Sequence, residues 1–396
     1  MKLTKAYWLL WTGQILNRIG LIAPAFLVIY LQRSGIINES AASLIVGLFG
    51  VGIVLAGLLG GVLAESIGPR KLILIAEPIA VLIALLYLVV RDPILIGILA
   101  LLSGALSTIE RPAGAALIST MVSPDHFPRA YGLHLMGFNV GTTLSLVLSG
   151  LFLEIFPPGI FMVWAACSAL YWGFAKSLPP DETVAKTEPF SLKNMARDLA
   201  EPYRQRSLVV FLVLCFIVAL IYLQVNSTLP LHMLSEGINS AQIGIVLAVN
   251  AVLSIVLLPL VPKLVAKWPD STPLVLASVF VGVGFGLNAF AHDVPFFLVA
   301  LIFWTIGEVL WAPMSAGYLA ARAPEGRTSS YMSSYFFVWN TAFMIGGPLG
   351  IVIANAFGYP ALWLGVLVLG LLGGLGFKLL AVPKESHAKT DAKTDA

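Results

Sequence analysis

Long apolar stretches separated by short polar segments are the feature that most constrains this 396-residue chain. Approximately twelve of them reach the length of about 19 residues that a helix needs to cross a hydrocarbon layer of about 30 Å. Charged residues make up only 11% of the sequence, far below the roughly one quarter found in soluble domains. The sequence therefore predicts an all-α integral membrane protein. The expected transmembrane helices cover residues 7–31, 41–64, 72–90, 94–122, 129–154, 159–178, 208–229, 241–262, 273–291, 295–320, 331–356 and 361–381.

The basic residues are distributed unevenly between the two ends of these helices. All but four of the 23 Lys and Arg residues fall in segments that lie on the same side as the N-terminus. Arg33 and Arg91 lie on the opposite side, and Arg18 and Arg111 lie within apolar runs. The positive-inside rule then predicts that both termini are cytoplasmic, in a bacterial cytoplasmic (inner) membrane. The net charge of +3 is expected to face anionic lipid and does not indicate nucleic-acid binding.

A polar interruption at residues 179–207 divides the chain near its middle. We expect an N-terminal six-helix bundle in residues 1–178, a C-terminal six-helix bundle in residues 208–382 and a disordered cytoplasmic tail in residues 383–396. An amphipathic helix on the membrane surface and a solvated connector are equally good interpretations of the cytoplasmic linker.

Several residues recur about 200 positions apart in the segments that follow the fourth and the tenth expected helices. The pairs are Ser123-Pro124 with Ala323-Pro324, Tyr131 with Tyr331, Asn139 with Asn340, and Gly150 with Gly350. Secondary transporters are commonly built from internal repeats, with the substrate site between them near mid-membrane. The two bundles are therefore predicted to be related by a repeat around a central cavity.

Five charged side chains lie inside the expected helices away from their ends, namely Arg18, Glu77, Glu110, Arg111 and Glu308. Each costs about 2.5–3.5 kcal/mol near the bilayer centre, so each calls for a partner or a function. The first half can neutralise itself, whereas Glu308 has no cation nearby in the sequence. Desolvation disfavours a charged carboxylate, so Glu308 is the first candidate for binding a coupling proton, followed by Glu110 and Glu77. A neutral Glu308 that only hydrogen-bonds to a neighbouring helix is the alternative.

Polar and aromatic residues are expected to line the substrate cavity together with these charges. They are Gln14, Asn17, Arg18, Arg111, Tyr222, Gln224, Asn226, Trp304, Trp311, Trp339 and Asn340. Trp304, Glu308 and Trp311 are spaced by four and three residues and therefore share one helical face. A lipophilic cation could stack on the indoles while it neutralises the carboxylate. Ordinary helix packing is the alternative for each Trp, and an outer-surface location is the alternative for Gln224 and Asn226.

The segment GGVLAESIGPRKLIL between the second and third expected helices resembles the loop signature of the major facilitator superfamily, with Glu where the family usually has Asp. The matching residues of this cytoplasmic gate loop are Gly61, Glu65, Gly68, Arg70 and Lys71. The resemblance implies a charge network that latches the two halves at the cytoplasmic face. Arg111 followed by Gly114 resembles the family motif centred on an arginine of the fourth helix, which implies a proton-relay or substrate contact. The whole chain resembles twelve-span drug and proton antiporters most closely.

Several function classes find no support in the sequence. It contains no Gly-Lys-Ser/Thr phosphate loop, its five His residues lack metal-ligand spacing, and no Ser, His and Asp set is evident. An enzyme is therefore not expected, and neither a cofactor nor a metal is predicted.

The sequence predicts a proton-coupled secondary transporter that exports amphipathic or drug-like small molecules by alternating access. Its expected partners are the small-molecule substrate, protons and membrane lipid, and it is expected to function as a monomer. Proton-coupled uptake of a small metabolite, such as an anion, is the first alternative, favoured by Arg18, Arg111 and the lack of a fifth-helix Gly-Pro pair that drug exporters tend to carry. A carrier-like receptor that transports nothing is the second.

Overall fold

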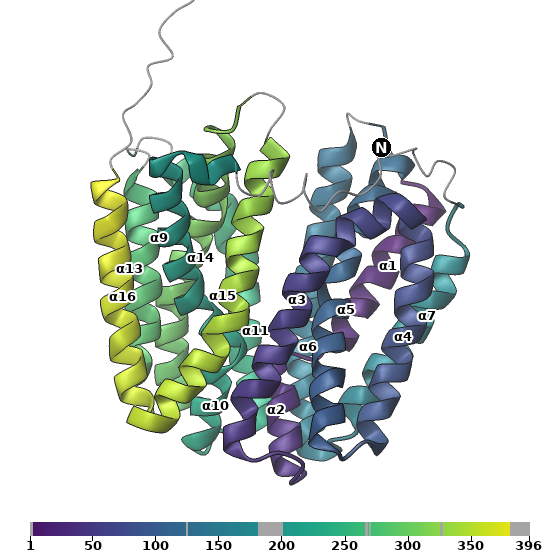
Figure 1. Ribbon diagram of the computed structural model, residues 1–396, viewed down its shortest axis with the longest axis horizontal. Helices are drawn as coiled ribbons and strands as arrows, with labels where there is room; N and C mark the ends of the chain where they lie inside the picture. Colours follow the sequence, from purple (N-terminus) through teal and green to yellow (C-terminus); the bar gives the residue numbers. More distant parts are fainter. Residues whose placement is uncertain are drawn as a thin grey trace, which may run out of the picture.

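The computed structural model describes residues 3–123, 126–180, 201–265, 268, 271–324 and 328–380, and these are almost entirely helical (Figure 1). Most of the predicted linker and the whole of the predicted tail lie outside the described residues. The α-helices of the first half are α1 (Lys5–Gly20), α2 (Pro24–Arg33), α3 (Glu39–Ile67), α4 (Pro69–Val89), α5 (Pro93–Met121), α6 (Phe127–Ile155) and α7 (Gly159–Lys176). Those of the second half are α9 (Arg206–Tyr222), α10 (Thr228–Ser235), α11 (Ser240–Leu257), α12 (Val261–Val265), α13 (Ser271–Leu287), α14 (Val294–Ala320), α15 (Thr328–Phe357) and α16 (Tyr359–Leu379). Short 3-10 turns occur at η2 (Glu201–Arg204), η3 (Leu223–Asn226), η4 (Leu258–Leu260) and η5 (Asn288–Phe290).

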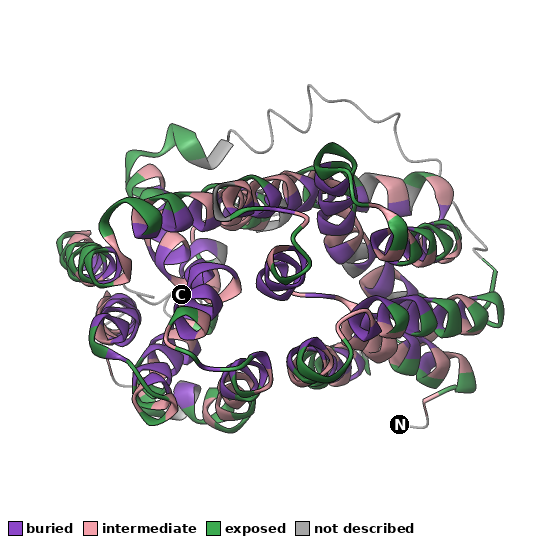
Figure 2. Ribbon diagram, turned by 90° about the horizontal axis from the view of Figure 1, so that it is seen from below, coloured by how far each residue is buried: buried purple, intermediate pink, exposed green. Residues whose placement is uncertain are grey.

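Eleven helical segments in the described part of the chain are long and apolar enough to cross a membrane. The 18-residue helix α7 packs alongside α1 and α4 and completes the first bundle. Together they give the twelve transmembrane helices that hydropathy predicts, arranged as two bundles side by side (Figure 1). Large apolar side chains are exposed on the outside of both bundles, as expected for surfaces that contact lipid. The view in Figure 2 shows exposed residues around the rim of the bundles and buried residues toward their interiors.

The internal repeat is visible in the turns that join the helices. α2 and α10 are each followed, two residues after their last residue, by a glycine with positive φ, Gly35 at 68° and Gly237 at 81°, a conformation that favours glycine. An asparagine then caps the next helix, Asn38 for α3 and Asn239 for α11. This shared turn supports the repeat that four pairs of residues predict elsewhere in the chain.

Two chain segments that hydropathy predicts as continuous helices are interrupted. α1 ends at Gly20, and α2 begins only at Pro24. Proline is favoured at the first position of a helix and disfavoured in its interior, since it has no N–H to donate. In the second half, α9 passes into the 3-10 turn η3 before α10 begins at Thr228. The short helices α2 and α10 contact each other across the two bundles.

The bundles are joined more extensively at one end than at the other. We call the end at which α1 begins and α16 ends the terminal face, and the opposite end, at which α2 and α10 end, the far face (Figure 1). Toward the far face, one apolar cluster contains residues of both bundles, such as Phe49 and Leu229. Toward the terminal face each bundle has its own cluster, around Tyr7 in the first and Phe211 in the second. The described structure is therefore closed at the far face.

Glycines allow the bundles to approach closely at this closed end. A Cβ atom on Gly50 of α3 would lie 2.5 Å from the Cα atom of Met344 on α15. A Cβ atom on Gly150 of α6 would overlap the carbonyl oxygen of Ser240 on α11. Backbone therefore meets backbone at both contacts between the bundles.

Candidate functional site

Two acidic side chains face each other inside the first bundle. Glu77 on α4 is fully buried, and Glu110 on α5 is 5% exposed. Their carboxyl groups lie within hydrogen-bonding range of each other. Two ionised carboxylates at this range repel, whereas a pair that shares one proton is held by a hydrogen bond. The sequence predicts both as proton-coupling residues but gives no indication that they meet.

Helix α1 supplies polar partners for this acidic pair. The Asn17 side-chain amide donates a hydrogen bond of 2.8 Å to a carboxylate oxygen of Glu77. Arg18 donates to the carbonyl oxygen of Ser107 at 3.0 Å, and its guanidinium carbon lies 4.3 Å from the centroid of the Phe138 ring. Arg18 also interacts electrostatically with both carboxyl groups. If the two carboxyl groups share one proton, the guanidinium balances their remaining charge and the cluster is neutral overall.

A small cavity opens beside the cluster. It contains about 290 Å³ of empty space, part of it open to solvent, and its lining residues are Gln14, Asn17, Arg18, Glu110, His134 and Phe138. Glu110 thus faces the cavity, while Glu77 is not among the lining residues. The side-chain oxygen of Gln14 is buried and has no hydrogen-bond partner within the described residues. A ligand that donates a hydrogen bond could satisfy it.

Glu308 on α14 is held by neutral polar groups. One carboxylate oxygen accepts hydrogen bonds from the Asn250 amide at 2.6 Å and from the Ser254 hydroxyl at 3.3 Å, both on α11. The Tyr222 hydroxyl at the end of α9 also donates to this carboxylate. Among the side chains that the structure describes, no basic residue makes an ion pair with Glu308. The acid therefore lies where three helices of the second bundle meet, without a permanent counter-charge.

The aromatic residues near Glu308 are used mainly in packing. Trp304 is fully buried and stacks on Phe285, with ring centroids 5.2 Å apart. The Trp311 indole donates to the Tyr335 hydroxyl at 3.1 Å. Trp339 is half-buried and meets Tyr222 edge to face, with centroids 5.8 Å apart. Of the three Trp residues predicted to line the cavity, Trp304 and Trp311 thus belong to the core of the second bundle.

The remaining predicted polar residues lie at the break in the seventh transmembrane helix and at the contact between the bundles. The Gln224 amide donates to the carbonyl oxygen of Gly346 at 2.8 Å and so ties η3 to α15. Asn226 is half-buried within η3. Asn340 on α15 lies against Gly57 of α3, where an added Cβ atom would be 2.5 Å from its amide nitrogen. These positions favour structural contacts of Gln224 and Asn340, and their role toward substrate stays a prediction.

Comparison with known proteins agrees with this architecture. The model of the Major Facilitator Superfamily matches residues 10–340 and 237–396. The chain belongs to the major facilitator superfamily. Among its relatives in this superfamily are two transporters of Bacillus subtilis, both described as uncharacterized MFS-type transporters. YttB is 26% identical over 328 residues, which cover 81% of this chain and 80% of YttB. YqjV is 23% identical over 336 residues, which cover 83% of this chain and 82% of YqjV.

Solved structures of transporters share the fold of this superfamily member. A POT family transporter in complex with 5-aminolevulinic acid has a TM-score of 0.76 at 14% identity, over 95% of this chain and 96% of that one. The nucleoside transporter NupG has a TM-score of 0.78 at 14% identity, over 95% and 99% of the two chains. At this level of identity the likeness supports the fold and does not extend to the substrate.

The superfamily's gate loop is described in part. Gly68 has a φ of 92° and precedes α4. Arg70 donates to the carbonyl oxygens of Ala175 at 3.1 Å and Lys176 at 2.8 Å and so caps the end of α7. Lys71 is exposed. The surroundings of Gly61 and the side chains of Glu65 and Arg111 lie outside what the structure describes, so a latch between the halves at this loop stays a prediction.

Sequence reasoning missed the partners of the two acidic sites. Asn250 and Ser254 are four residues apart in α11, which is otherwise apolar after its first turn, so they share one helical face, and this spacing could have marked them as a polar site. Tyr171 on α7 is fully buried and interacts electrostatically with Glu77 and Glu110. A lone Tyr in an apolar helix carries no comparable signal, because aromatic residues are common in such helices.

Proposed function

We propose that this superfamily member is a proton-coupled secondary transporter that exports amphipathic cations or other drug-like molecules by alternating access. The observation that carries the proposal is the environment of Glu308, which has hydrogen-bond donors on α9 and α11 and no basic partner among the described side chains. A proton and a substrate cation would each neutralise this carboxylate. They therefore compete for the same site, which is the requirement for exchange of one for the other.

The balance of charge favours a cation over an anion. Arg18 is already matched by the acidic pair Glu77 and Glu110. Binding of an anion at Arg18 would leave that pair without its cation. Uptake of an anionic metabolite, the first alternative, is favoured by the position of Arg18 beside the cavity, but the anion would compete with this acidic pair for Arg18.

The distribution of basic residues supports a cytoplasmic terminal face, in a bacterial cytoplasmic membrane. With this orientation, closure at the far face corresponds to an inward-facing state that can accept a substrate from the cytoplasm. Each bundle has its own apolar cluster and carries its own candidate site, so we propose that one chain, embedded in lipid, is sufficient for transport.

Reconstitution into liposomes tests this function. With an imposed pH gradient, we expect the wild type to accumulate a lipophilic cation such as tetraphenylphosphonium, and Glu308→Gln to lose this gradient-driven accumulation. Glu236→Gln makes the same chemical change at the far face and serves as the matched control. The coupling assignment is wrong if Glu308→Gln transports every compound that the wild type accumulates at an unchanged rate and to an unchanged extent.

A further inference from the structure

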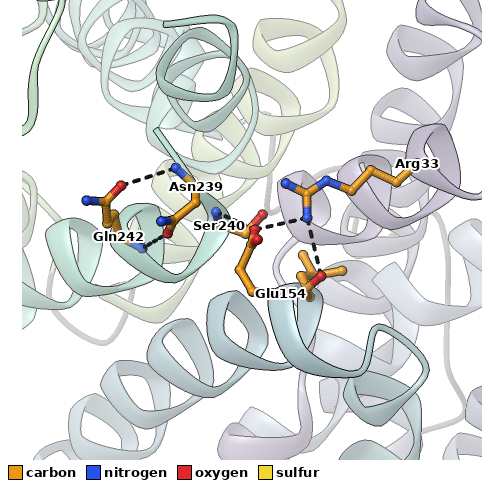
Figure 3. Close-up of polar contacts among 6 residues, drawn as sticks. Arg33, Glu154, Asn239, Ser240 and Gln242 are labelled. Atoms are coloured by element: carbon orange, nitrogen blue, oxygen red, sulfur yellow. Dashed lines mark hydrogen bonds and ion pairs between the residues drawn. The ribbon is translucent and has the colours of Figure 1, made fainter. Parts of the chain in front are cut away.

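A carboxylate of the first bundle touches the start of a helix in the second bundle at the far face. Glu154, near the end of α6, accepts a hydrogen bond of 2.8 Å from the backbone N–H of Ser240, the first residue of α11. The same oxygen accepts from the Arg33 guanidinium at 2.9 Å. Arg33 also donates to the carbonyl oxygen of Leu153 at 3.3 Å. Figure 3 shows the Glu154 carboxylate between Arg33 on one side and Ser240 on the other.

Only one of these contacts crosses between the bundles. Arg33 ends α2 and Glu154 belongs to α6, so their ion pair lies entirely within the first bundle. The bond from Ser240 to Glu154 joins the second bundle to the first. The ion pair can therefore orient the carboxylate, but it cannot by itself hold the two bundles together.

The start of α11 is suited to receive an anion. The first N–H groups of a helix lack partners within the helix and carry partial positive charge. At α11 the Asn239 side chain accepts from the backbone N–H of Gln242 at 2.9 Å, and the Gln242 side chain accepts in return from Asn239. This capping box leaves the N–H of Ser240 to be satisfied by Glu154.

The backbones of α6 and α11 meet at this point. A Cβ atom on Gly244 of α11 would overlap the carbonyl oxygen of Leu146 on α6, and one on Gly150 would overlap that of Ser240. With the backbones this close, opening of the far face would have to separate the carboxylate from the N–H.

We propose that Glu154 acts as a latch that holds the far face closed. Its carboxylate caps α11 of the opposite bundle and so sets the balance between far-face-closed and far-face-open states. Arg33 is the positioning residue for this carboxylate. The proposal rests on the alternating access of the proposed function but is independent of the transported compound and of the coupling ion. A carboxylate at a partly buried helix N-terminus can stabilise the closed state by about tenfold.

Distance measurements between spin labels on the two bundles test the latch directly. Val89→Cys at the end of α4 and Phe290→Cys in η5 place labels at exposed far-face positions outside the latch, and the buried native residues Cys167 and Cys215 are replaced by Ala. Glu154→Gln is expected to increase the open-to-closed ratio about tenfold. Arg91→Ala, which removes an exposed far-face charge outside the latch, is the matched control and should leave the ratio unchanged. An unchanged ratio in Glu154→Gln overturns the proposal.

Substitutions at Ser240 test the latch from the other bundle. Ser240→Pro removes the donated N–H at a helix position that tolerates proline, whereas Ser240→Ala keeps the N–H. We expect Ser240→Pro to raise the open-to-closed ratio as Glu154→Gln does, and Ser240→Ala to leave it as in the wild type. The double variant Ser240→Pro with Glu154→Gln should differ little from either single variant. Fully additive effects, or an effect of Ser240→Ala equal to that of Ser240→Pro, contradict the proposal.

A charge exchange separates the latch from the ion pair. Arg33→Glu combined with Glu154→Arg rebuilds an ion pair within the first bundle but presents a cation to the positive end of α11. The double variant is expected to stay as open as Glu154→Gln, and recovery of the wild-type ratio would show that the ion pair alone matters. These distances do not depend on proton coupling, so a failure of the latch can be told apart from a failure of the proposed export.

Discussion

At the scale of single residues, the Asn250 amide approaches the Glu308 carboxylate to 2.6 Å from the neighbouring helix. A hydrogen bond to a charged group contributes about 1.5–3 kcal/mol. Asn250→Ala removes this bond from the deprotonated form of Glu308 and should slow gradient-driven transport about tenfold or more. Initial rates in proteoliposomes measure the effect.

Asn288→Ala is the matched control for this change, because Asn288 donates only to carbonyl oxygens at the end of α13, at 2.9 Å for that of Phe285. Equal rates for wild type and Asn250→Ala would show that the amide has no part in coupling.

The acidic pair of the first bundle makes a second prediction at this scale. In Glu77→Gln or Glu110→Gln, the remaining carboxylate still neutralises Arg18, and the new amide can still donate to it. The double variant leaves Arg18 without a counter-charge, and we expect it to lose about 3 kcal/mol in the free energy of unfolding. Chemical unfolding in detergent measures the free energy of unfolding of the three variants. If the double variant loses no more free energy than the two single variants lose together, the shared-proton arrangement is contradicted.

Sequence alone identifies these acids but not their neighbours. Glu77, Glu110 and Glu308 stand out because charges are costly within apolar helices. Which helix faces them depends on rotation and register between helices, and a single sequence does not encode these in a readable pattern. For this reason the contacts Glu77 to Glu110 and Asn250 to Glu308 emerge only from the structure.

At the scale of helices, α6 packs against α1 through glycine. A Cβ atom on Gly141 would lie 2.6 Å from the Arg18 Cβ atom and 2.9 Å from the carbonyl oxygen of Ile15. Gly141→Ala should therefore force the helices apart and lower the free energy of unfolding by about 1–3 kcal/mol, as overpacking does elsewhere.

Gly132 on the same helix provides the control, because an added Cβ atom there meets nothing within 4 Å. Gly132→Ala should stabilise the protein by up to about 1 kcal/mol, since alanine favours the helix more than glycine. Thermal unfolding of both variants in one detergent compares them, and equal effects at the two positions would contradict the close packing of α1 on α6.

Hydropathy predicts where the long helices lie but not where they break. The expected helix at residues 7–31 contains the gap between α1 and α2, because an interruption of a few apolar residues leaves the average hydropathy unchanged. Gly20 and Pro24 bracket that gap and are its only trace in the sequence. The change to η3 near Leu223 has no proline or glycine to mark it.

At the scale of the whole molecule, the closed far face can be locked to test alternating access. A Cβ atom on Gly347 of α15 would lie 2.6 Å from a methyl group of Val46 on α3, in the opposite bundle. The pair Val46→Cys and Gly347→Cys should therefore form a disulfide across the bundles. Oxidation is expected to abolish transport and reduction to restore it, with each single Cys variant as a control. Undiminished transport after complete cross-linking would contradict movement of the bundles at this contact.

The overall arrangement is the level at which the sequence predicts most. Uneven Lys and Arg placement, twelve apolar runs and a repeat of about 200 residues lead to two bundles of six helices, as the structure and the family relationship show. The sequence does not reveal which end of the molecule is closed. That depends on small differences between two packings of the same helices.

The single apolar cluster shared by both bundles has one further consequence. Its side chains, including Phe49 and Leu229, would be exposed to water on both bundles when the far face opens, and this exposure of apolar surface costs free energy. A substrate with an apolar surface could bind between the separating side chains and shield them from water. An apolar substrate would thereby lower the free-energy cost of opening the face through which the proposed export releases it.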